Sequence, residues 1–195
     1  FIFFGGTGAA TISTATFVEF RGSAAGGQFG RPAVVLPDLN GDGLGEVAIA
    51  APNEGTKRGR IYIYRGRTAA AWATAMATGG GFIPTSAADW VIEGITPAAS
   101  GLAGFGRTRP SYTSVGDLNG DGVAEFTVPA ASNLHNKLFV FSGKDVGAAD
   151  AGTIFTTGDS PVANQAFQTL SRILIPLNNP GRTGTIDGFG CSAFG

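Results

Sequence analysis

Two nine-residue segments of the chain carry oxygen-bearing side chains at the same positions. They run from Asp38 to Glu46 and from Asp117 to Glu125, with Asp, Asn, Asp and Glu at positions 1, 3, 5 and 9. A hard cation such as Ca²⁺ binds about six to eight oxygens, and alternate residues of a tight loop can direct their oxygens to one centre. A glycine after the third of these residues permits the sharp turn, because glycine tolerates positive φ. The spacing predicts two Ca²⁺ sites.

Each predicted site has four side-chain ligands and the backbone carbonyl of position 7. The predicted ligands are Asp38, Asn40, Asp42, Leu44 and Glu46 in the first site, and Asp117, Asn119, Asp121, Val123 and Glu125 in the second. The loops are not EF-hands, which need a bidentate Glu at position 12, where this chain has Ile49 and Val128. The alternative is a pair of metal-free Asn-Gly and Asp-Gly turns. Without a cation, however, three carboxylates at ligand spacing would repel one another.

Each loop belongs to a longer repeat. A Phe-Gly pair precedes each loop, at Phe29-Gly30 and Phe105-Gly106, and a third pair, Phe189-Gly190, opens what would be another copy. An apolar run follows each loop, and an alternating aromatic strand follows the run. With a further strand before each Phe-Gly pair, every unit has four short strands, which is typical of a β-propeller blade. The alternative fold is a β-sandwich. The expected strands are 16–22, 33–36, 47–51, 60–66, 89–94, 137–143 and, less clearly, 164–175.

The pattern also predicts how these strands are buried and where insertions lie. The apolar runs 33–36 and 47–51 are expected to be inner strands buried on both faces, and the alternating outer strands to have one wetter face. Two inserts, 68–88 and 145–160, lengthen the units. Trp72 and Met76, four residues apart among alanines, favour one short helix packed on the propeller rim. The alternative for these inserts is a partner-binding loop.

These features resemble the FG-GAP repeat of integrin α-subunit propellers. The resemblance rests on Phe29-Gly30, the loop 38–46 and Ala50-Ala51-Pro52, where the family usually has Gly-Ala-Pro, and on the equivalent loop 117–125. The second copy departs from Gly-Ala-Pro, and the family commonly has Asp where this chain has Glu46 and Glu125. The resemblance implies an all-β, partial β-propeller of four-stranded FG-GAP blades. Its expected divisions are 1–28 (end of one blade), 29–104 and 105–188 (complete blades) and 189–195 (start of a further blade).

The same resemblance implies Ca²⁺ in both loops on the lower face of the propeller, and ligand recognition on the opposite face. Closed propellers have about four to eight blades, and this chain supplies about two and a half. We therefore expect further blades, supplied either by a longer polypeptide, of which this chain is a part, or by other copies or partner chains.

Other residue types exclude several kinds of chemistry. His135 is the only histidine, and it lies in an expected turn, so we predict no Ser-His-Asp or Cys-His catalysis. The sequence has no zinc-type His/Cys cluster and no phosphate-binding loop. A net charge of −1 gives no support to nucleic-acid binding. No run of residues is long and apolar enough for membrane insertion. The only cysteine, Cys191, is either a small buried residue or bonded to a residue outside this chain.

The sequence therefore predicts a non-enzymatic, calcium-stabilised, extracellular or cell-surface β-propeller segment that mediates protein binding, adhesion or assembly. Three alternatives remain open. The first is a carbohydrate-binding propeller, in which aromatic residues stack on sugars. The second is a structural subunit of an extracellular fibre, and the third is an accessory propeller of a larger enzyme. The aromatic candidates for glycan contact are Tyr62, Tyr64, Trp72, Trp90 and Tyr112.

Overall fold

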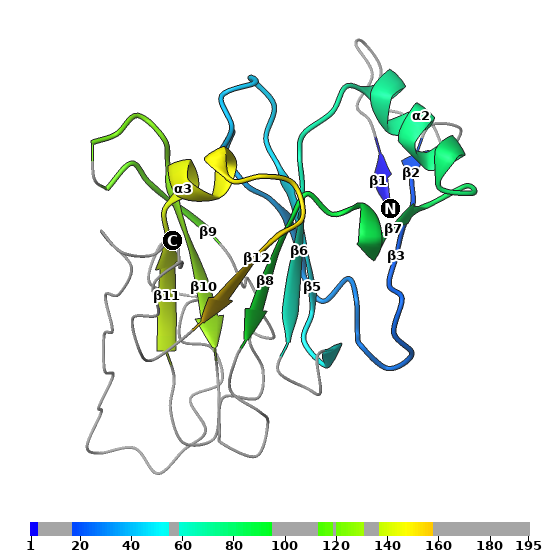
Figure 1. Cartoon of the computed structure of the whole chain (residues 1–195), viewed down its shortest axis with the longest axis horizontal. Coiled ribbons are helices and arrows are strands. Elements are labelled where there is room, and N and C mark those ends of the chain that lie inside the picture. Colours follow the sequence, from blue (N-terminus) through cyan, green and yellow to red (C-terminus); the bar gives the residue numbers. More distant parts are fainter. Residues whose placement is uncertain (4–16, 55–58, 95–112, 119, 131–136, 158–195) are drawn as a thin grey trace.

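The computed structural model describes residues 1–3, 17–54, 59–94, 113–118, 120–130 and 137–157. Within these ranges the chain consists mainly of short strands, with two α-helices and one 3₁₀ turn (Figure 1). The expectation of a mainly β chain is confirmed. Among the described residues, no helix combines the length and the hydropathy needed to cross a bilayer.

Four antiparallel strands form the first unit. They are β4 (Ala33–Val35), β5 (Val47–Ala51), β6 (Arg60–Tyr64) and β8 (Trp90–Gly94). β4 runs into the first acidic loop and β5 leaves it, and the strands pair in the order β4-β5-β6-β8. These are the four strands expected from the sequence of this unit, and their prediction is confirmed.

The second unit shows the same arrangement around the second acidic loop. It contains β9 (Thr113–Gly116), β10 (Glu125–Ala130) and β11 (Lys137–Phe141), which are antiparallel and pair in the order β11-β10-β9. The predicted fourth strand, 164–175, lies outside the described residues, as do the second and third Phe-Gly pairs. Upstream of the first unit lie β1 (Ile2–Phe3), β2 (Phe17–Val18) and β3 (Phe20–Arg21), and β1 pairs with β2 in antiparallel orientation.

Both inserts fold as a helix followed by a strand. The first contains α2 (Ala69–Thr78), β7 (Ile83–Pro84) and the 3₁₀ turn η1 (Thr85–Ala87), and the second contains α3 (Gly143–Ala148) and β12 (Thr153–Thr157). Each of these strands pairs in parallel with the last strand before its own unit, β7 with β3 and β12 with β8. β12 therefore extends the first unit to a five-stranded sheet. The sequence analysis did not predict this parallel pairing.

The short helix expected from Trp72 and Met76 is α2. It begins after Thr68, whose hydroxyl accepts a hydrogen bond from the backbone N–H of Ala71 at 3.3 Å and thereby satisfies one of the free amides of the first turn. It ends at Gly79, where the N–H still bonds to the carbonyl of Ala75. Trp72 is buried, with its ring centroid 5.3 Å from that of Phe20. The prediction of a packed helix is confirmed.

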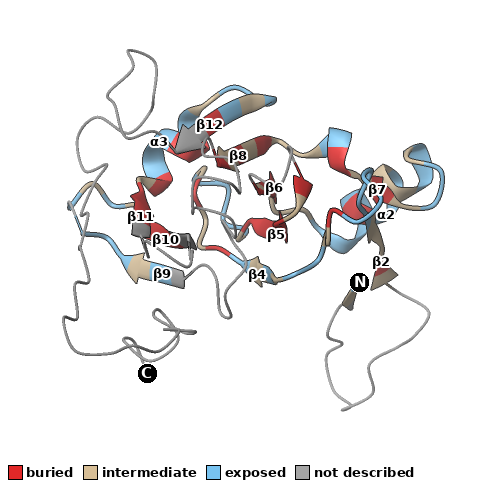
Figure 2. Cartoon of the chain, turned by 90° about the horizontal axis from the view of Figure 1, so that it is seen from below, coloured by how far each residue is buried: buried red, intermediate tan, exposed pale blue. Residues whose placement is uncertain are grey.

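Two clusters of buried side chains hold the units together. One joins the first and second units, and the other joins the first unit to the strands upstream of it and to α2 (Figure 2). Every residue of β5 is buried, while β8 alternates between buried and intermediate residues, as predicted. The first cluster contains Leu36, Leu39, Ala48, Ala50, Ile61, Ile63, Trp90, Ile92, Phe126, Val128, Phe139, Phe141, Val146 and Phe155.

One expectation about buried residues needs correction. Segment 33–36 was expected to be buried on both faces, but Ala33 and Val35 are exposed and only Leu36 is buried. The reason is that β4 is the edge strand of the five-stranded sheet.

Four of the five aromatic candidates for stacking on sugars are core residues. Tyr62, Tyr64, Trp72 and Trp90 are all buried, and Tyr112 lies outside the described residues. These four side chains therefore offer no ring face to a glycan.

Candidate metal centres

The first acidic loop is wrapped around the carboxylate of Asp38. The backbone N–H groups of Gly41 and Asp42 donate to Asp38 Oδ1 at 2.7 and 3.2 Å, and that of Gly43 donates to Asp38 Oδ2 at 2.7 Å. Gly41 and Gly43 have φ values of 80° and 84°, a region that side-chain-bearing residues rarely adopt. These glycines therefore allow the backbone to turn its amides toward position 1.

The second loop repeats this geometry. Gly120 and Asp121 donate to Asp117 Oδ1 at 2.7 and 3.1 Å, and Gly122 donates to Asp117 Oδ2 at 2.8 Å. Gly120 and Gly122 have φ values of 76° and 87°. The two loops have the same residues at positions 1, 3, 5 and 9 and the same hydrogen bonds to position 1, so they are two copies of one structural motif. Asn119, a predicted ligand of this loop, lies outside the described residues.

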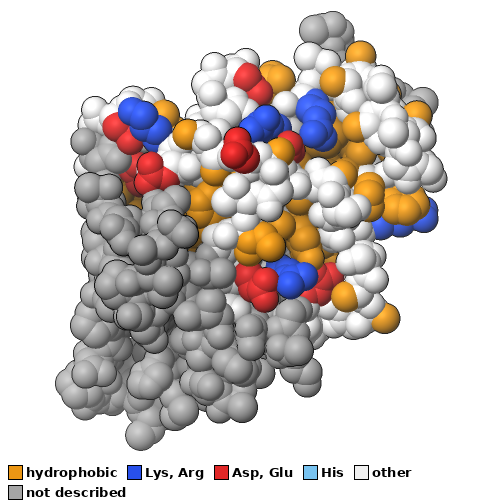
Figure 3. Space-filling model, in the orientation of Figure 1, with side chains coloured by type: hydrophobic (Ala, Val, Ile, Leu, Met, Phe, Trp, Pro, Cys, Tyr) orange, Lys and Arg blue, Asp and Glu red, His pale blue; other side chains and the backbone are white. Residues whose placement is uncertain are grey.

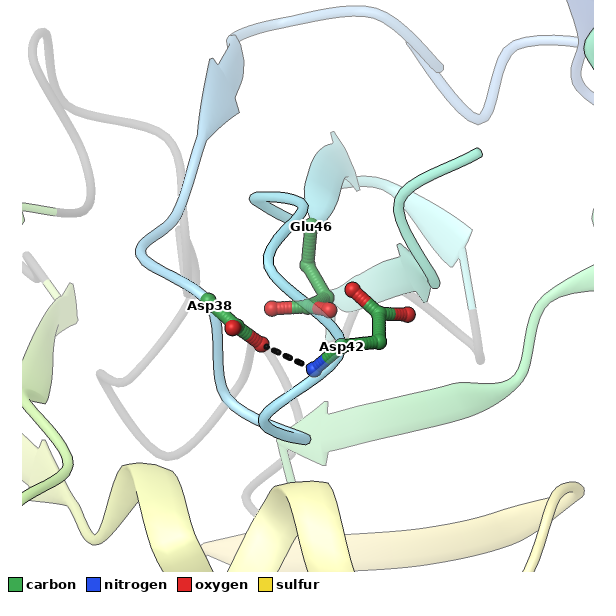
Figure 4. A group of neighbouring side chains, drawn as sticks. All are labelled: Asp38, Asp42 and Glu46. Carbon is green, nitrogen blue, oxygen red and sulfur yellow. Dashed lines mark hydrogen bonds between the residues drawn. The ribbon is translucent and has the colours of Figure 1, made fainter. Parts of the chain in front are cut away.

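The carboxylates of positions 1, 5 and 9 converge in both loops. One oxygen each from Asp38, Asp42 and Glu46 lie within 4.8 Å of one another, and the same holds for Asp117, Asp121 and Glu125. Figure 4 shows the first three side chains on the inside of the loop, facing one another. Because Ca²⁺–oxygen distances are about 2.3–2.6 Å, oxygens bound to one ion lie at most ~5 Å apart. The spacing therefore fits a single Ca²⁺ in each loop.

The buried glutamate of the first loop has a free oxygen. Glu46 is fully buried, and its Oε2 accepts a hydrogen bond from the backbone N–H of Leu39 at 2.7 Å. Its Oε1 is also buried and has no hydrogen-bond partner. A buried carboxylate oxygen without a partner is costly, and a bound cation would satisfy it. The donor set of the first loop therefore fits a divalent cation.

The pKa values of this loop reflect the same geometry. Burial raises the pKa of Glu46 to about 7, and the negative charges of Asp38 and Asp42 add to the effect, while the hydrogen bond from Leu39 opposes it. For Asp38, burial pushes the pKa upward, but the bonds from the backbone N–H groups of the loop outweigh it, so the pKa is lowered. The metal-free loop thus holds a position-1 carboxylate stabilised as an anion beside a position-9 carboxylate that resists ionisation.

Positions 3 and 7 complete the predicted ligand set. Asn40 Oδ1 accepts a hydrogen bond from the backbone N–H of Asp42 at 2.8 Å, and its Nδ2 donates to Asp42 Oδ2 at 3.1 Å. Asn40 therefore lies beside one of the converging carboxylates. The backbone N–H of Leu44 donates to Asp42 Oδ1 at 2.8 Å, and that of Val123 donates to Asp121 Oδ1 at 2.9 Å. Ligation by these side chains and by the carbonyls of Leu44 and Val123 stays a prediction.

One contact to the sites was missed by the sequence analysis. The N–H of Leu39 bonds to Glu46, and the N–H of Leu118 bonds to Glu125 Oε2, also at 2.7 Å. Both leucines occupy position 2 of their loop. No residue type could have signalled this contact, because the donor is a backbone N–H, which every residue except proline carries.

Several charged groups outside the loops form ion pairs in the described part of the chain. Arg60 contacts Glu93 at 3.0 Å, and Arg67 contacts Asp89 at 3.3 Å. On the face drawn in Figure 3, basic and acidic side chains of the described residues lie near one another, without one large patch of a single sign. His135 and Cys191 both lie outside the described residues. Within that part of the chain, the two acidic loops are the only groups of three or more potential metal-ligating side chains.

The arrangement of strands around the two acidic loops is that of a repeat protein. The loop, the strand before it and the two strands after it occur twice among the described residues, as parts of an acidic-loop β-repeat. Residues 29–64 match the FG-GAP repeat model. This segment contains Phe29-Gly30, the first acidic loop, and strands β4 to β6. The predicted resemblance is confirmed: the chain carries an FG-GAP repeat.

Several integrin α subunits are similar to the chain. It is 29% identical over 114 residues to integrin alpha-2 of Bos taurus, an alignment covering 58% of this chain and 8% of that protein. It is 29% identical over 137 residues to integrin alpha-4 of Xenopus laevis, covering 66% and 11%. A 40-residue stretch is 52% identical to integrin alpha-X of Mus musculus, covering 20% and 3%. The chain thus spans about a tenth of the length of these relatives. Their similarity agrees with the expected extracellular or cell-surface location.

Proposed function

We propose that this chain is a calcium-stabilised segment of an extracellular β-propeller that mediates protein binding, adhesion or assembly. The observation that carries the proposal is the recurrence of one acidic loop, with the same internal hydrogen bonds, in two consecutive β units of a chain with an FG-GAP repeat. In this proposal the first and second units are neighbouring blades, and further blades of the same or another chain complete the propeller.

The calcium in this proposal is structural. Each loop connects two antiparallel strands, β4 to β5 or β9 to β10. Three carboxylates converge there, and one of them is buried in each loop. Like charges at this spacing oppose closure of the loop, whereas a divalent cation would neutralise them and hold the ends of the two strands together. The proposed ligands are those predicted from the sequence, including Asn40 and Asn119.

The partner in this proposal is another protein or another blade. Support comes from the similarity to integrin α subunits and from the packing of the two units through a shared apolar cluster. The end of the blades away from the acidic loops is the proposed recognition surface. A glycan partner has no support among the described aromatic residues, because those considered for that role are buried.

The test is calcium-dependent stability of loop variants. Asp42→Ala and Asp121→Ala each remove one of the converging carboxylates, and Asp150→Ala, which changes an exposed acidic residue outside the loops, is the matched control. Thermal unfolding is followed in excess CaCl₂ and in EGTA. We expect wild type and the control to gain stability from calcium, each single variant to gain less, and the double variant to gain nothing. Identical melting of the wild type with and without chelator would contradict the proposal.

Calcium titration calorimetry gives an independent readout. Two binding sites are expected in the wild type and one in each single variant. Two unchanged sites in Asp42→Ala would show that the first loop is not a binding site.

A further inference from the structure

The second insert lies directly on the first acidic loop. Gly143 and Gly147 lie one helical turn apart in α3. Gly147 faces Leu39 and Asn40 of the first loop, whereas Gly143 faces both Leu39 and the end of the second loop. A Cβ atom added at Gly147 would lie 1.8 Å from the carbonyl oxygen of Leu39 and 2.9 Å from the backbone nitrogen of Asn40. One added at Gly143 would lie 2.1 Å from the carbonyl oxygen of Ala124 in the second loop, and 3.0 Å from both Val123 Cγ1 and Leu39 Cδ2. Figure 4 shows this helix, in yellow, alongside the loop. The backbone of α3 therefore packs against the backbone of a proposed metal loop in the preceding unit.

Leu39 links this helix to a proposed ligand. Its side chain is 2% exposed and belongs to the same apolar cluster as Val146 of α3. Its backbone N–H donates to the buried carboxylate of Glu46. A displacement of α3 would therefore shift Leu39, whose N–H holds the carboxylate of Glu46 in place.

The second loop provides an internal comparison. Leu118 occupies the position of Leu39 and makes the same hydrogen bond, to Glu125. Its side chain, however, is 53% exposed, whereas that of Leu39 is 2% exposed. The two loops thus share their internal structure but differ in their contact with α3. The helix meets the first loop at Leu39 and Asn40 through Gly147, and the second loop at Val123 and Ala124 through Gly143.

The insert then continues from the loop to the outer strand of the same unit. After α3, the carbonyl of Ala149 accepts a hydrogen bond from Trp90 Nε1 at 3.0 Å, and the N–H of Gly152 donates to the carbonyl of Asp89 at 2.6 Å. β12 then pairs with β8 along its whole length, from Thr153 opposite Trp90 to Thr157 opposite Gly94. Residues 143–157 therefore span the first unit from its acidic loop to its outer strand.

We propose that this insert is a calcium-linked clasp between the two units. The inference rests on the proposed function, in which the first loop binds Ca²⁺. Calcium fixes Leu39 and Asn40 in the positions against which α3 docks, and the docked helix in turn raises the affinity of the first site. The two effects are reciprocal, because a coupling free energy acts equally in both directions. Because Gly143 also faces the second loop, the coupling specific to the first site is assigned to Gly147, whose three nearest neighbouring atoms all belong to Leu39 and Asn40.

Gly147→Ala tests the coupling. Alanine favours a helix over glycine by about 1 kcal/mol, so any loss of calcium affinity in this variant does not come from a weaker helix. Lys144→Ala, which changes an exposed residue of α3, is the matched control. Each change is made in Asp121→Ala, which leaves the first site, and in Asp42→Ala, which leaves the second. Calcium titration should show Kd at the first site raised about fivefold or more, the low end of ordinary coupling. The change at the second site should be smaller, and the control should show none. Equal Kd values for Gly147→Ala and its parent at the first site would overturn the inference.

Hydrogen exchange of the wild type tests the same coupling without a substitution, so the inference stays testable if Gly147→Ala does not fold. Removing calcium with EGTA should accelerate exchange of the β12 amides more than exchange of the β11 amides. If calcium binds but the exchange of β12 is unchanged, the clasp is wrong and the proposed function stands. If the wild type binds no calcium, both are wrong.

Discussion

Replacing Glu46 by glutamine should have opposite effects on the metal-free and the calcium-bound protein. Glutamine has nearly the same shape and keeps an oxygen for the N–H of Leu39, but it carries no charge. In the metal-free protein, burial raises the pKa of Glu46 from 4.5 to about 7. Above pH 7 the folded protein therefore holds an ionised carboxylate in a place that favours the neutral acid.

The size of the effect follows from that pKa. A difference of about 2.5 units, at ~1.4 kcal/mol per unit, corresponds to about 3 kcal/mol. This value is an upper limit, because Asp42 on the same loop is exposed and water screens part of the repulsion. In EGTA at pH 8, Glu46→Gln should therefore raise the free energy of unfolding by up to about 3 kcal/mol. In calcium the same variant should be less stable than wild type, since it lacks an anionic ligand.

The pH dependence has a defined sign. A carboxyl group whose pKa is higher in the folded state destabilises that state as it ionises, so the cost is absent below pH 4.5, grows between pH 4.5 and 7, and is complete above pH 7. Urea unfolding in EGTA across this range should show the advantage of Glu46→Gln over wild type growing with pH. Asp150→Asn, an exposed change, is the control. A glutamine variant less stable than wild type in EGTA at pH 8 would refute the reasoning.

Two further predictions concern packing of the inserts. Phe155→Ala changes a residue of β12 that is 4% exposed and should lower the free energy of unfolding in urea by about 3–5 kcal/mol. Ile154→Ala changes a residue that is 57% exposed and should lower it by well under half as much. Equal losses would mean that β12 does not pack as described. Trp72→Ala should cost about 3–5 kcal/mol because the ring is buried against Phe20, and Met76→Ala, at a half-buried residue of the same helix, should cost less. Comparable costs for Trp72 and Met76 would argue against the packing of α2.

The parts of the fold that could be predicted from the sequence are those with a local signal. Alternating aromatic residues predicted β6, a continuous apolar run predicted β5, and acidic residues at alternate positions predicted the loops whose carboxylates converge. Each of these follows from residue types a few positions apart, because strand periodicity and loop geometry are set by the neighbouring backbone.

Parallel pairing could not be predicted in the same way. β12 pairs with β8, about sixty residues earlier in the chain, and neither segment carries a mark of its partner. The exposure of Val35 was missed for a related reason: whether a strand lies at the edge of a sheet depends on what covers it and not on its own residues. The packing of α3 on Leu39 likewise depends on two glycines whose meaning appears only once the helix has been placed.

The parallel contact between β12 and β8 has a consequence for synthesis on the ribosome. β8 ends at Gly94, but β12, the strand that pairs with it, is not complete until Thr157 has been added. At roughly 5–20 residues per second, those 63 residues take about 3–13 s. During that time the nascent chain exposes one open edge of β8. The first unit therefore completes its five-stranded sheet only as the second unit is translated, and a chaperone that covers β-strand edges could bind β8 during that interval.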